Sequence, residues 1–277
     1  MSAIANILGV SRSNLVRSMK GDLVVRRQRY HKECDKDLLP AIQKLVSHRP
    51  TYGYRRITAV LNRERALEGL PPVNHKRCYR IMEQNNLLLT RYTGKRVKRA
   101  STGKVVTLHS NTRWASDGFE IRCWNKDVVR VTFLIDTCDR EVIAWEASTG
   151  GFTGESVRNV IILALEYRFG EHRTPRPIQL LSDNGSAYIA RETRAFAEMV
   201  GLNPCFTPVR NPESNGLAES FVKTFKRDYV FVNDRSDAET VLKQLTGWFE
   251  DYNEYHPHKG LKMKSPREFI RAQRASA

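Results

Sequence analysis

Three carboxylates in the 277-residue chain lie where they could act on a phosphodiester bond. Asp117 lies inside the strand-like stretch TRWASDGFEI, Asp183 ends an apolar run at the turn SDNG, and Glu219 lies in the amphipathic stretch LAESFVKTFKRD. Oxygen ligands of this kind suit Mg²⁺, and two ions about 4 Å apart can activate the attacking oxygen and stabilise the leaving one. Because clustered carboxylates repel one another, a cation would also be needed to hold them together.

Each of these acids also has a purely structural interpretation. The turn after Asp183 is common turn chemistry, and Asp117 could occupy a bulge beside a glycine. Glu219 precedes Lys223 by four residues, an orientation that stabilises a helix by only about 0.3–0.5 kcal/mol. Asp136 is interpreted as structural because a hairpin turn follows two residues later. Spacing alone does not select three acids from the 23 that follow position 110.

The sequence beyond residue 110 predicts the elements that would position these acids. Strands are expected in RWASDGFEIRCW and, on both sides of a hairpin turn near Cys138, in VVRVTFLIDTCDREVIAWEAS. Apolar periodicity predicts helices at about 154–168, 190–200, 236–254 and 266–273, and strands at PIQLL and 203–207. The pattern favours an α/β sheet with helices on both faces. Neighbouring first and fourth strands would join Asp117 to Asp183, and the helix after the fifth strand would add Glu219.

The positive charge of the chain is confined to its first part. The whole sequence has 46 basic and 30 acidic residues, and residues 1–110 contain 23 of the basic residues but only 7 of the acidic ones. The net charge of +16 therefore lies in the first 110 residues, and the remainder is balanced. A basic module of this kind is expected of a protein that binds a polyanion such as nucleic acid. A merely cationic, soluble surface is the alternative.

The sequence predicts a small helical region within the basic first 110 residues. Helices are predicted at about 36–47, with Pro40 in the first turn, in RRITAVLNRERALEG, and in PPVNHKRCYRIMEQNNLL, where Asn74 is the N-cap. The last helix has Lys76, Arg77 and Arg80 clustered on one side, which fits insertion into a DNA major groove. A solvated face of a helical bundle is the alternative.

Two flanking segments extend the basic part. Residues 3–19 resemble the later half of a helix-turn-helix, for which a small helical hairpin is the alternative. The basic stretch at 90–108 is predicted to follow a phosphate backbone through Arg96, Lys98 and Arg99.

The sequence does not indicate a disulfide framework, a zinc site, a signal peptide or a membrane-spanning segment. The five cysteines are scattered without a C-x-x-C pair, so neither a disulfide framework nor a zinc site is expected. The His256-Pro257-His258 stretch is interpreted as structural. The sequence has no signal-peptide pattern and no apolar run long enough to span a membrane. We therefore expect a cytoplasmic protein with access to DNA.

A family resemblance adds what periodicity does not supply. The stretches WASDGFEI, LLSDNGSAY and NPESNGLAESFVKTFKRDY resemble the three acidic motifs of DDE transposases and retroviral integrases. Thirty-five residues separate Asp183 from Glu219, and Lys226 follows seven residues later, as in that family. The chain is most similar to OrfB-type transposases of bacterial insertion sequences, through RPTYGYRRITAVLN, VNHKRCYRIMEQNNLL and DYNEYHPHKGLKMKSPREFI. One departure is His256, where the family pattern has an arginine.

The resemblance implies an RNase H-like integrase core, with a mixed five-stranded sheet and helices on both faces, preceded by a small all-α helix-turn-helix region. It implies that Asp117, Asp183 and Glu219 bind Mg²⁺ or Mn²⁺, two ions per site, and that Lys226 contacts the terminal DNA of the element. The further candidate DNA contacts are Lys223, Arg227, Arg55, Arg56, Lys76, Arg77, Arg80, Arg96, Lys98 and Arg99.

The expected reaction is metal-dependent cleavage of a DNA strand followed by transfer of the freed 3′-OH to another strand. The expected partners are double-stranded DNA, at least one further copy of the chain, and an upstream OrfA-type fusion partner. The expected domains are an N-terminal segment at 1–29, a helix-turn-helix domain at 30–89, a linker at 90–108 and a catalytic domain at 109–277. Alternatives are an RNase H-like structure-specific nuclease and a non-catalytic DNA-binding regulator, for which no acid triplet or metal is needed.

Overall fold

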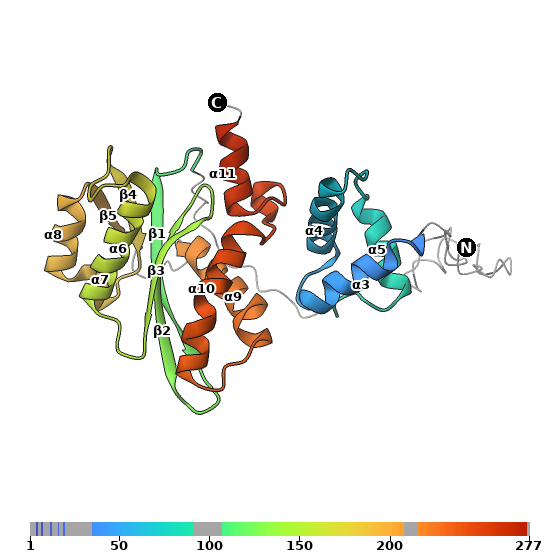
Figure 1. Ribbon diagram of the computed structural model, residues 1–277, viewed down its shortest axis with the longest axis horizontal. Helices are drawn as coiled ribbons and strands as arrows, with labels where there is room; N and C mark the ends of the chain where they lie inside the picture. The colour runs from blue at the N-terminus through green and yellow to red at the C-terminus, as the bar shows by residue number, and fades with distance from the viewer. Residues whose placement is uncertain are drawn as a thin grey trace.

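The computed structural model describes residues 35–90, 107–207 and 215–275, together with the isolated positions 4, 7, 12, 16 and 19. The helix-turn-helix half expected at 3–19 lies largely outside these residues. The basic linker, with Arg96, Lys98 and Arg99, also lies almost entirely outside them. The described residues form a small helical domain and a larger α/β domain (Figure 1).

The helical domain consists of α3 (Leu39–His48), α4 (Tyr54–Leu67) and α5 (His75–Gln84). As predicted, Pro40 lies in the first turn of α3, and the Asn74 side chain caps α5 by accepting a hydrogen bond from the Lys76 N–H at 2.9 Å. The three helices share a closed apolar core. Its fully buried members are Ile42, Ile57, Leu61, Cys78, Ile81 and Met82.

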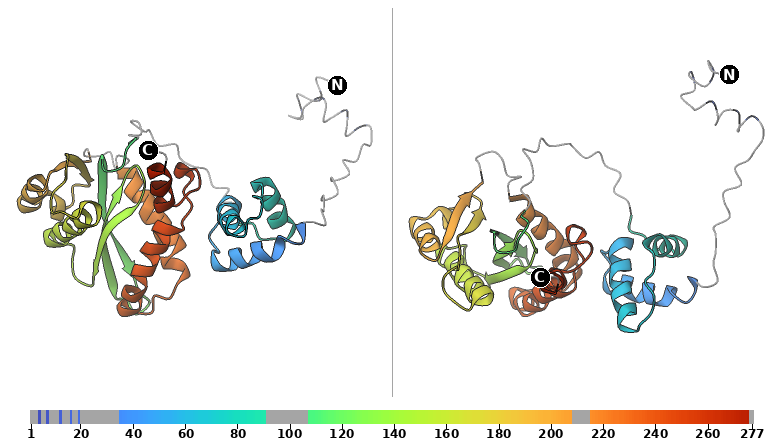
Figure 2. Two further views of the ribbon diagram at one scale, coloured as in Figure 1. Left: turned by 45° about the horizontal axis from the view of Figure 1, so that its top comes forward. Right: turned by 90° about the horizontal axis from the view of Figure 1, so that it is seen from above.

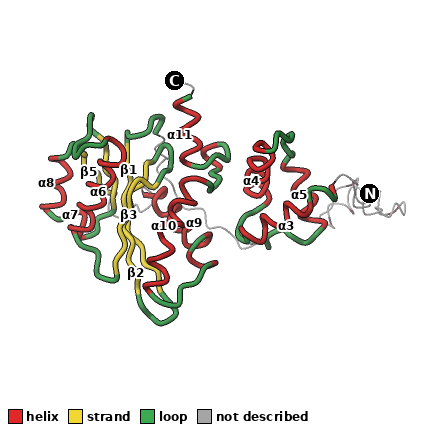
Figure 3. The backbone as a smooth tube through the Cα atoms, in the orientation of Figure 1, coloured by secondary structure: helices red, strands yellow, loops and turns green. Residues whose placement is uncertain are grey.

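The α/β domain is built on a five-stranded mixed sheet with the order β3-β2-β1-β4-β5 (Figure 3). Its strands are β1 (Arg113–Arg122), β2 (Val128–Asp136), β3 (Val142–Ser148), β4 (Ile178–Ser182) and β5 (Leu202–Phe206). The first three strands form an antiparallel meander, whereas β4 pairs in parallel with both β1 and β5. The first and fourth strands are therefore neighbours, an arrangement that the sequence allowed.

Helices cover both faces of this sheet because its strand residues alternate between two apolar cores. Trp114 packs with α6 (Gly154–Phe169), and α7 (Ser186–Ile189) and α8 (Arg191–Met199) complete that face. Ala115 and Phe119 face the other core, which α9 (Gly216–Asp228) and α10 (Ala238–Glu254) complete. Figure 2 shows the two helical layers on opposite sides of the strands. The predicted mixed sheet with helices on both faces is confirmed.

The remaining elements are the short 3₁₀ turns η3 (Val230–Val232) and η4 (Lys259–Leu261) and the helix α11 (Pro266–Arg274). His256 and His258 lie before η4, and burial lowers the pKa of both imidazoles, so they are neutral packing groups. Asp136 ends β2 and accepts hydrogen bonds from the backbone N–H groups of Asn111, Cys138 and Asp139. These contacts support the structural interpretation of Asp136 and of the two histidines.

Candidate active site and nucleic-acid interface

The pairing of β1 with β4 brings Asp117 and Asp183 to the same place. The last paired residues of these parallel strands are Ala115 and Leu181, so each aspartate lies two residues further along its own chain. Ala115 and Leu181 belong to the core beneath α9, and the alternation of strands directs Asp117 toward that same face. Asp117 therefore faces the side of the sheet where α9 packs, and Asp183 lies directly after the end of the neighbouring strand.

Backbone N–H groups hold one oxygen of each aspartate. Asp117 Oδ1 accepts from the Gly118 N–H at 2.8 Å, and Asp183 Oδ1 accepts from the Gly185 N–H at 3.0 Å. The turn that contains Asp183 is itself tied to the exit of β5, because the Asn184 side chain donates to the carbonyl of Thr207 at 2.9 Å. The turn chemistry recognised in the sequence therefore orients a carboxylate.

Helix α9 brings the third acid to this face. The apolar side chains of Phe221 and Phe225 are buried against Phe133 and Phe119 of the sheet, which fixes the helix along β1. Glu219 lies in the first turn of α9, where a negative charge is favourable. Its side chain is 40% exposed and accepts from Lys223 Nζ at 3.3 Å. The salt bridge between Glu219 and Lys223, which was the structural interpretation of Glu219 from the sequence, is thus present.

The charges of Asp183 and Glu219 both act on Asp117. Burial, together with these two negative charges, raises the pKa of Asp117 to about 6. Among the residues described, no group of three His, Cys, Asp or Glu side chains is gathered closely enough to hold a metal ion as it stands. The structure thus places Asp183 and Glu219 near enough to act on the charge of Asp117, while Glu219 pairs with Lys223.

Two positioning residues were missed by the sequence analysis. The Tyr188 hydroxyl and Ser116 Oγ are 2.9 Å apart, which joins α7 to β1 one residue before Asp117. Asn215, which is buried just before α9, donates from its amide to the carbonyl of Ser116 at 3.4 Å. Their only signals in the sequence are their places within LLSDNGSAY and NPESNGLAES, because a contact made across the fold leaves no periodicity.

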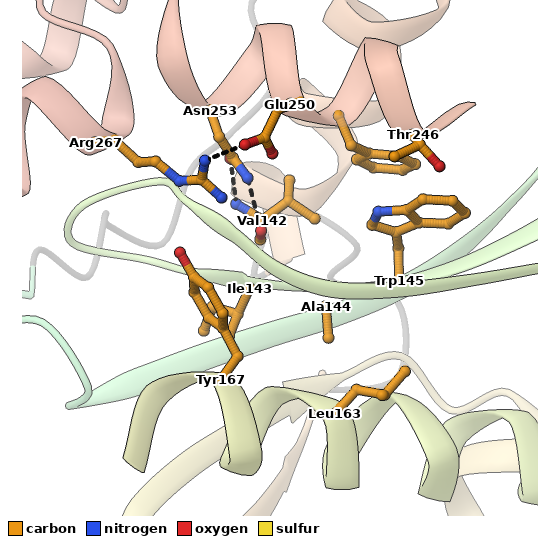
Figure 4. Close-up of a pocket in the computed structure, with 11 residues that line it drawn as sticks. Val142, Ile143, Ala144, Trp145, Leu163, Tyr167, Thr246, Glu250, Asn253 and Arg267 are labelled. Atoms are coloured by element: carbon orange, nitrogen blue, oxygen red, sulfur yellow. Dashed lines mark hydrogen bonds and ion pairs between the residues drawn. The ribbon is translucent and has the colours of Figure 1, made fainter. Parts of the chain in front are cut away.

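A cavity of about 250 Å³ lies elsewhere, at the free edge of the sheet (Figure 4). It is lined by β3, α6 and α10, and the edge strand β3 is separated from β1 by β2. The Asn253 side chain accepts from the Val142 N–H and donates to the Val142 carbonyl, both at 2.9 Å. Arg267 donates to Glu250 beside this contact. These groups cover the hydrogen-bonding edge of the sheet, so we assign the cavity to the architecture and not to the reaction.

The candidate DNA contacts of α9 have different environments. Lys223 is exposed and next to Glu219. Lys226 Nζ lies 5.6 Å from the ring centre of Phe119, and burial lowers the pKa of its ammonium group. Arg227 instead donates two hydrogen bonds to the buried carboxylate of Asp228, at 2.6 and 2.7 Å.

The candidate DNA contacts of the helical domain are similarly divided. Lys76 is exposed at the start of α5, and Arg55 lies over the ring of Tyr54. Arg77 and Arg80 both form ion pairs with Asp35, at 2.7 and 2.6 Å. Arg56 donates to Asp228 at 2.9 Å, across the boundary between the two domains.

Comparison with known proteins agrees with this architecture. The chain matches the integrase core domain family over residues 108–212 and a second integrase core family over 200–266, and it matches the HTH-like domain family over residues 33–96. The simian T-cell lymphotropic virus intasome in complex with PP2A regulatory subunit B56 gamma is similar in fold. It has a TM-score of 0.50 and 18% identity, over 83% of this chain and 73% of that chain. The fold is that of an integrase catalytic core preceded by an HTH-like domain.

The sequence relatives narrow this class. Transposase InsD for insertion element IS2A/D/F/H/I/K of Escherichia coli is 49% identical over 99% of this chain and 92% of its own length. Transposase InsD for insertion element IS2-9 of Escherichia coli strain K12 is also 49% identical, over 99% of this chain and 90% of its own. The chain therefore belongs to the insertion-element transposases with an integrase core domain, which are polynucleotidyl transferases that act on DNA. In the residues described, no helix has the length and apolarity needed to cross a membrane.

Proposed function

We propose that this transposase cuts and joins DNA strands at the ends of its insertion element, with Asp117, Asp183 and Glu219 as the catalytic acids. The observation that carries the proposal is that Asp183, at the end of β4, and Glu219, at the start of α9, both act electrostatically on Asp117 of β1. Water is the nucleophile when the strand is cut, and the freed 3′-OH is the nucleophile when it is joined. The alternative of a non-catalytic regulator leaves this convergence unexplained.

The donor chemistry of the site fits Mg²⁺ or Mn²⁺. All three side chains offer carboxylate oxygens, and their mutual repulsion favours a bound cation. Two such ions supply an activated oxygen nucleophile and stabilisation of the leaving oxygen when they are bound. The Gly118 and Gly185 N–H groups orient Asp117 and Asp183, whereas Glu219 must leave Lys223 to join them. We propose that this exchange releases Lys223 to contact a phosphate.

We assign the DNA contacts to the cations that are not committed to buried acids. On α9 these are Lys223 and Lys226, and in the helical domain they are Lys76 and Arg55. Because two element ends must be processed together, we propose at least a dimer on DNA. We further propose that an upstream OrfA-type protein is fused to the chain in the active form. The domain limits at 29, 89 and 108 belong to the same proposal.

Glu219→Gln tests the assignment, with Glu239→Gln as a matched control. Glu239 also lies in the first turn of its helix, α10, and also pairs with a lysine four residues later. In the Glu219 variant, the rate of Mg²⁺-dependent cleavage and joining should fall by at least about 100-fold. Loss of a residue that only supports a metal ligand typically costs about 10–100-fold, so a larger loss indicates a ligand. DNA affinity measured by fluorescence anisotropy should not change. Equal cleavage by the two variants would exclude Glu219 from the site.

A further inference from the structure

Three arginines of the helical domain bind acids of the catalytic domain. Arg49 donates to Asp251 of α10 with both terminal nitrogens, and Arg56 Nη1 donates to Asp228 Oδ2 at 2.9 Å. Arg63 Nη2 lies 2.6 Å from Glu268 Oε2 at the start of α11. We call these three ion pairs the docking contact. In Figures 1 and 2, α4 lies between α5 and the C-terminal helices, in agreement with these pairs.

The docking contact has a buried and specific centre. Tyr52 is 2% exposed and His256 is fully buried, and the Tyr52 hydroxyl is 2.9 Å from His256 Nδ1. The carboxylate of Asp228 is also buried, with a side-chain exposure of 1%. Arg63 adds hydrogen bonds to two backbone carbonyls before α11, at 2.6 and 3.0 Å. Buried charges require well-placed partners, so these contacts define one particular arrangement of the two domains.

The covalent connection would not impose that arrangement. Sixteen residues, 91–106, separate the described parts of the two domains, and sixteen residues can span up to about 55 Å. Many relative positions are therefore compatible with the connecting chain. The position that the structure shows depends on the docking contact.

The docking contact lies between the two functional parts of the molecule. Helix α9 has Glu219 in its first turn and Asp228 as its last residue, and Asp228 accepts a hydrogen bond from Arg56. On the other side, α4 packs against α5, which presents Lys76 at its exposed first turn. One short path thus connects the helix expected to bind DNA with the helix that carries a catalytic acid.

We propose that the docking contact sets the distance along DNA between the base pairs bound by the helical domain and the phosphodiester that is cut. Arg49, Arg56 and Arg63 are then positioning residues that determine where the element end is cleaved, and not phosphate contacts. B-DNA rises about 3.4 Å per base pair, so a domain shift of that size moves the cleavage position by one nucleotide. This inference rests on the proposed function.

The test compares the triple variant Arg49→Ala/Arg56→Ala/Arg63→Ala with Arg65→Ala. Arg65 is a half-buried arginine of α4 whose Nε donates to the carbonyl of Pro71 within its own domain. Both proteins cleave an end-labelled duplex with the terminal sequence of the chain's own element in Mg²⁺, and the products are mapped at nucleotide resolution. Small-angle X-ray scattering of each protein measures whether the domains separate. The single variant Arg56→Ala, which leaves Arg227 paired with Asp228, serves if the triple variant does not fold.

We expect the triple variant to have a larger radius of gyration and to cut at phosphodiesters one or two nucleotides on either side of the native position. Arg56→Ala should show the same spread to a smaller extent, and Arg65→Ala should cut only at the native position. Separated domains that still cut at the native position would overturn the inference, as would domains that remain docked without the arginines. A wild-type protein that does not cut in Mg²⁺ would instead refute the proposed function, and this inference with it.

Discussion

Replacing Asp117 with asparagine should stabilise the metal-free protein while it abolishes the reaction. The pKa of this carboxyl is raised from 3.8 to about 6, first by burial and then by the neighbouring acids. Each pKa unit corresponds to about 1.4 kcal/mol, so the charged carboxylate costs on the order of 3 kcal/mol at neutral pH. Asparagine has nearly the same shape and its oxygen can still accept from the Gly118 N–H, but it carries no charge.

The sign of the pH dependence follows from the raised pKa of Asp117. The folded state retains the proton of Asp117 between about pH 4 and pH 6, so the wild-type protein loses stability as the pH rises through that range. The advantage of Asp117→Asn in free energy of unfolding should therefore be near zero at pH 4 and about 2–3 kcal/mol at pH 7.5. Urea denaturation in EDTA at both pH values measures it.

A control and a metal titration complete this experiment. Asp37→Asn, at an exposed carboxylate of the helical domain, should change stability by less than about 0.5 kcal/mol. Mg²⁺ at 100 times its dissociation constant should stabilise the wild-type protein by about 2.7 kcal/mol and leave Asp117→Asn unchanged. An Asp117→Asn protein that is less stable than the wild type in EDTA, or equally responsive to Mg²⁺, would refute the reasoning.

Three further changes test the surroundings of the site. Lys223→Ala should cost less than about 0.5 kcal/mol of stability. It should also tighten Mn²⁺ binding, measured by calorimetry, because Glu219 loses the lysine that competes with the metal. Weaker binding would contradict the proposed exchange of Lys223 for the metal. Gly118→Ala places a Cβ 2.7 Å from the ring of Phe152, but that side chain is exposed and can shift, so thermal unfolding should show a cost below about 1 kcal/mol. A larger loss that Phe152→Ala relieves would show that the ring is held in place. Asn253→Ala should lower the free energy of unfolding by about 1–3 kcal/mol and speed amide hydrogen exchange in β3, because the N–H and carbonyl of Val142 lose their partner. Unchanged exchange would show that the edge strand is covered in another way.

The sequence predicted most of the fold because its signals are local. Strand alternation in β1 and β2, the apolar stripe of α6 and the Asn74 cap all depend on neighbours close in the chain. The helix-turn-helix and integrase core regions were recognised through motifs that are similarly contiguous. The side-by-side position of β1 and β4 was only a possibility at that stage, because parallel pairing depends on contacts more than sixty residues apart.

The site was predicted less completely, for a physical reason. The three acids were recognised by their motifs, but the ion pairs that occupy Arg56 and Arg227 depend on Asp228 being buried between two domains. Counting charges in the sequence does not distinguish an arginine that is free to contact DNA from one that forms an ion pair, because the acidic partner is brought close only by the fold. Tyr188 and Asn215 were missed for the same reason, because their partner, Ser116, is distant in the chain.

Anomalous diffraction from crystals soaked in Mn²⁺ tests the central claim most directly. Anomalous peaks report the positions of bound Mn²⁺ independently of activity and of the DNA sequence. We expect two peaks within coordination distance of the carboxylates of Asp117, Asp183 and Glu219, with Glu219 turned away from Lys223. Mn²⁺ bound elsewhere, or bound without either aspartate, would contradict it.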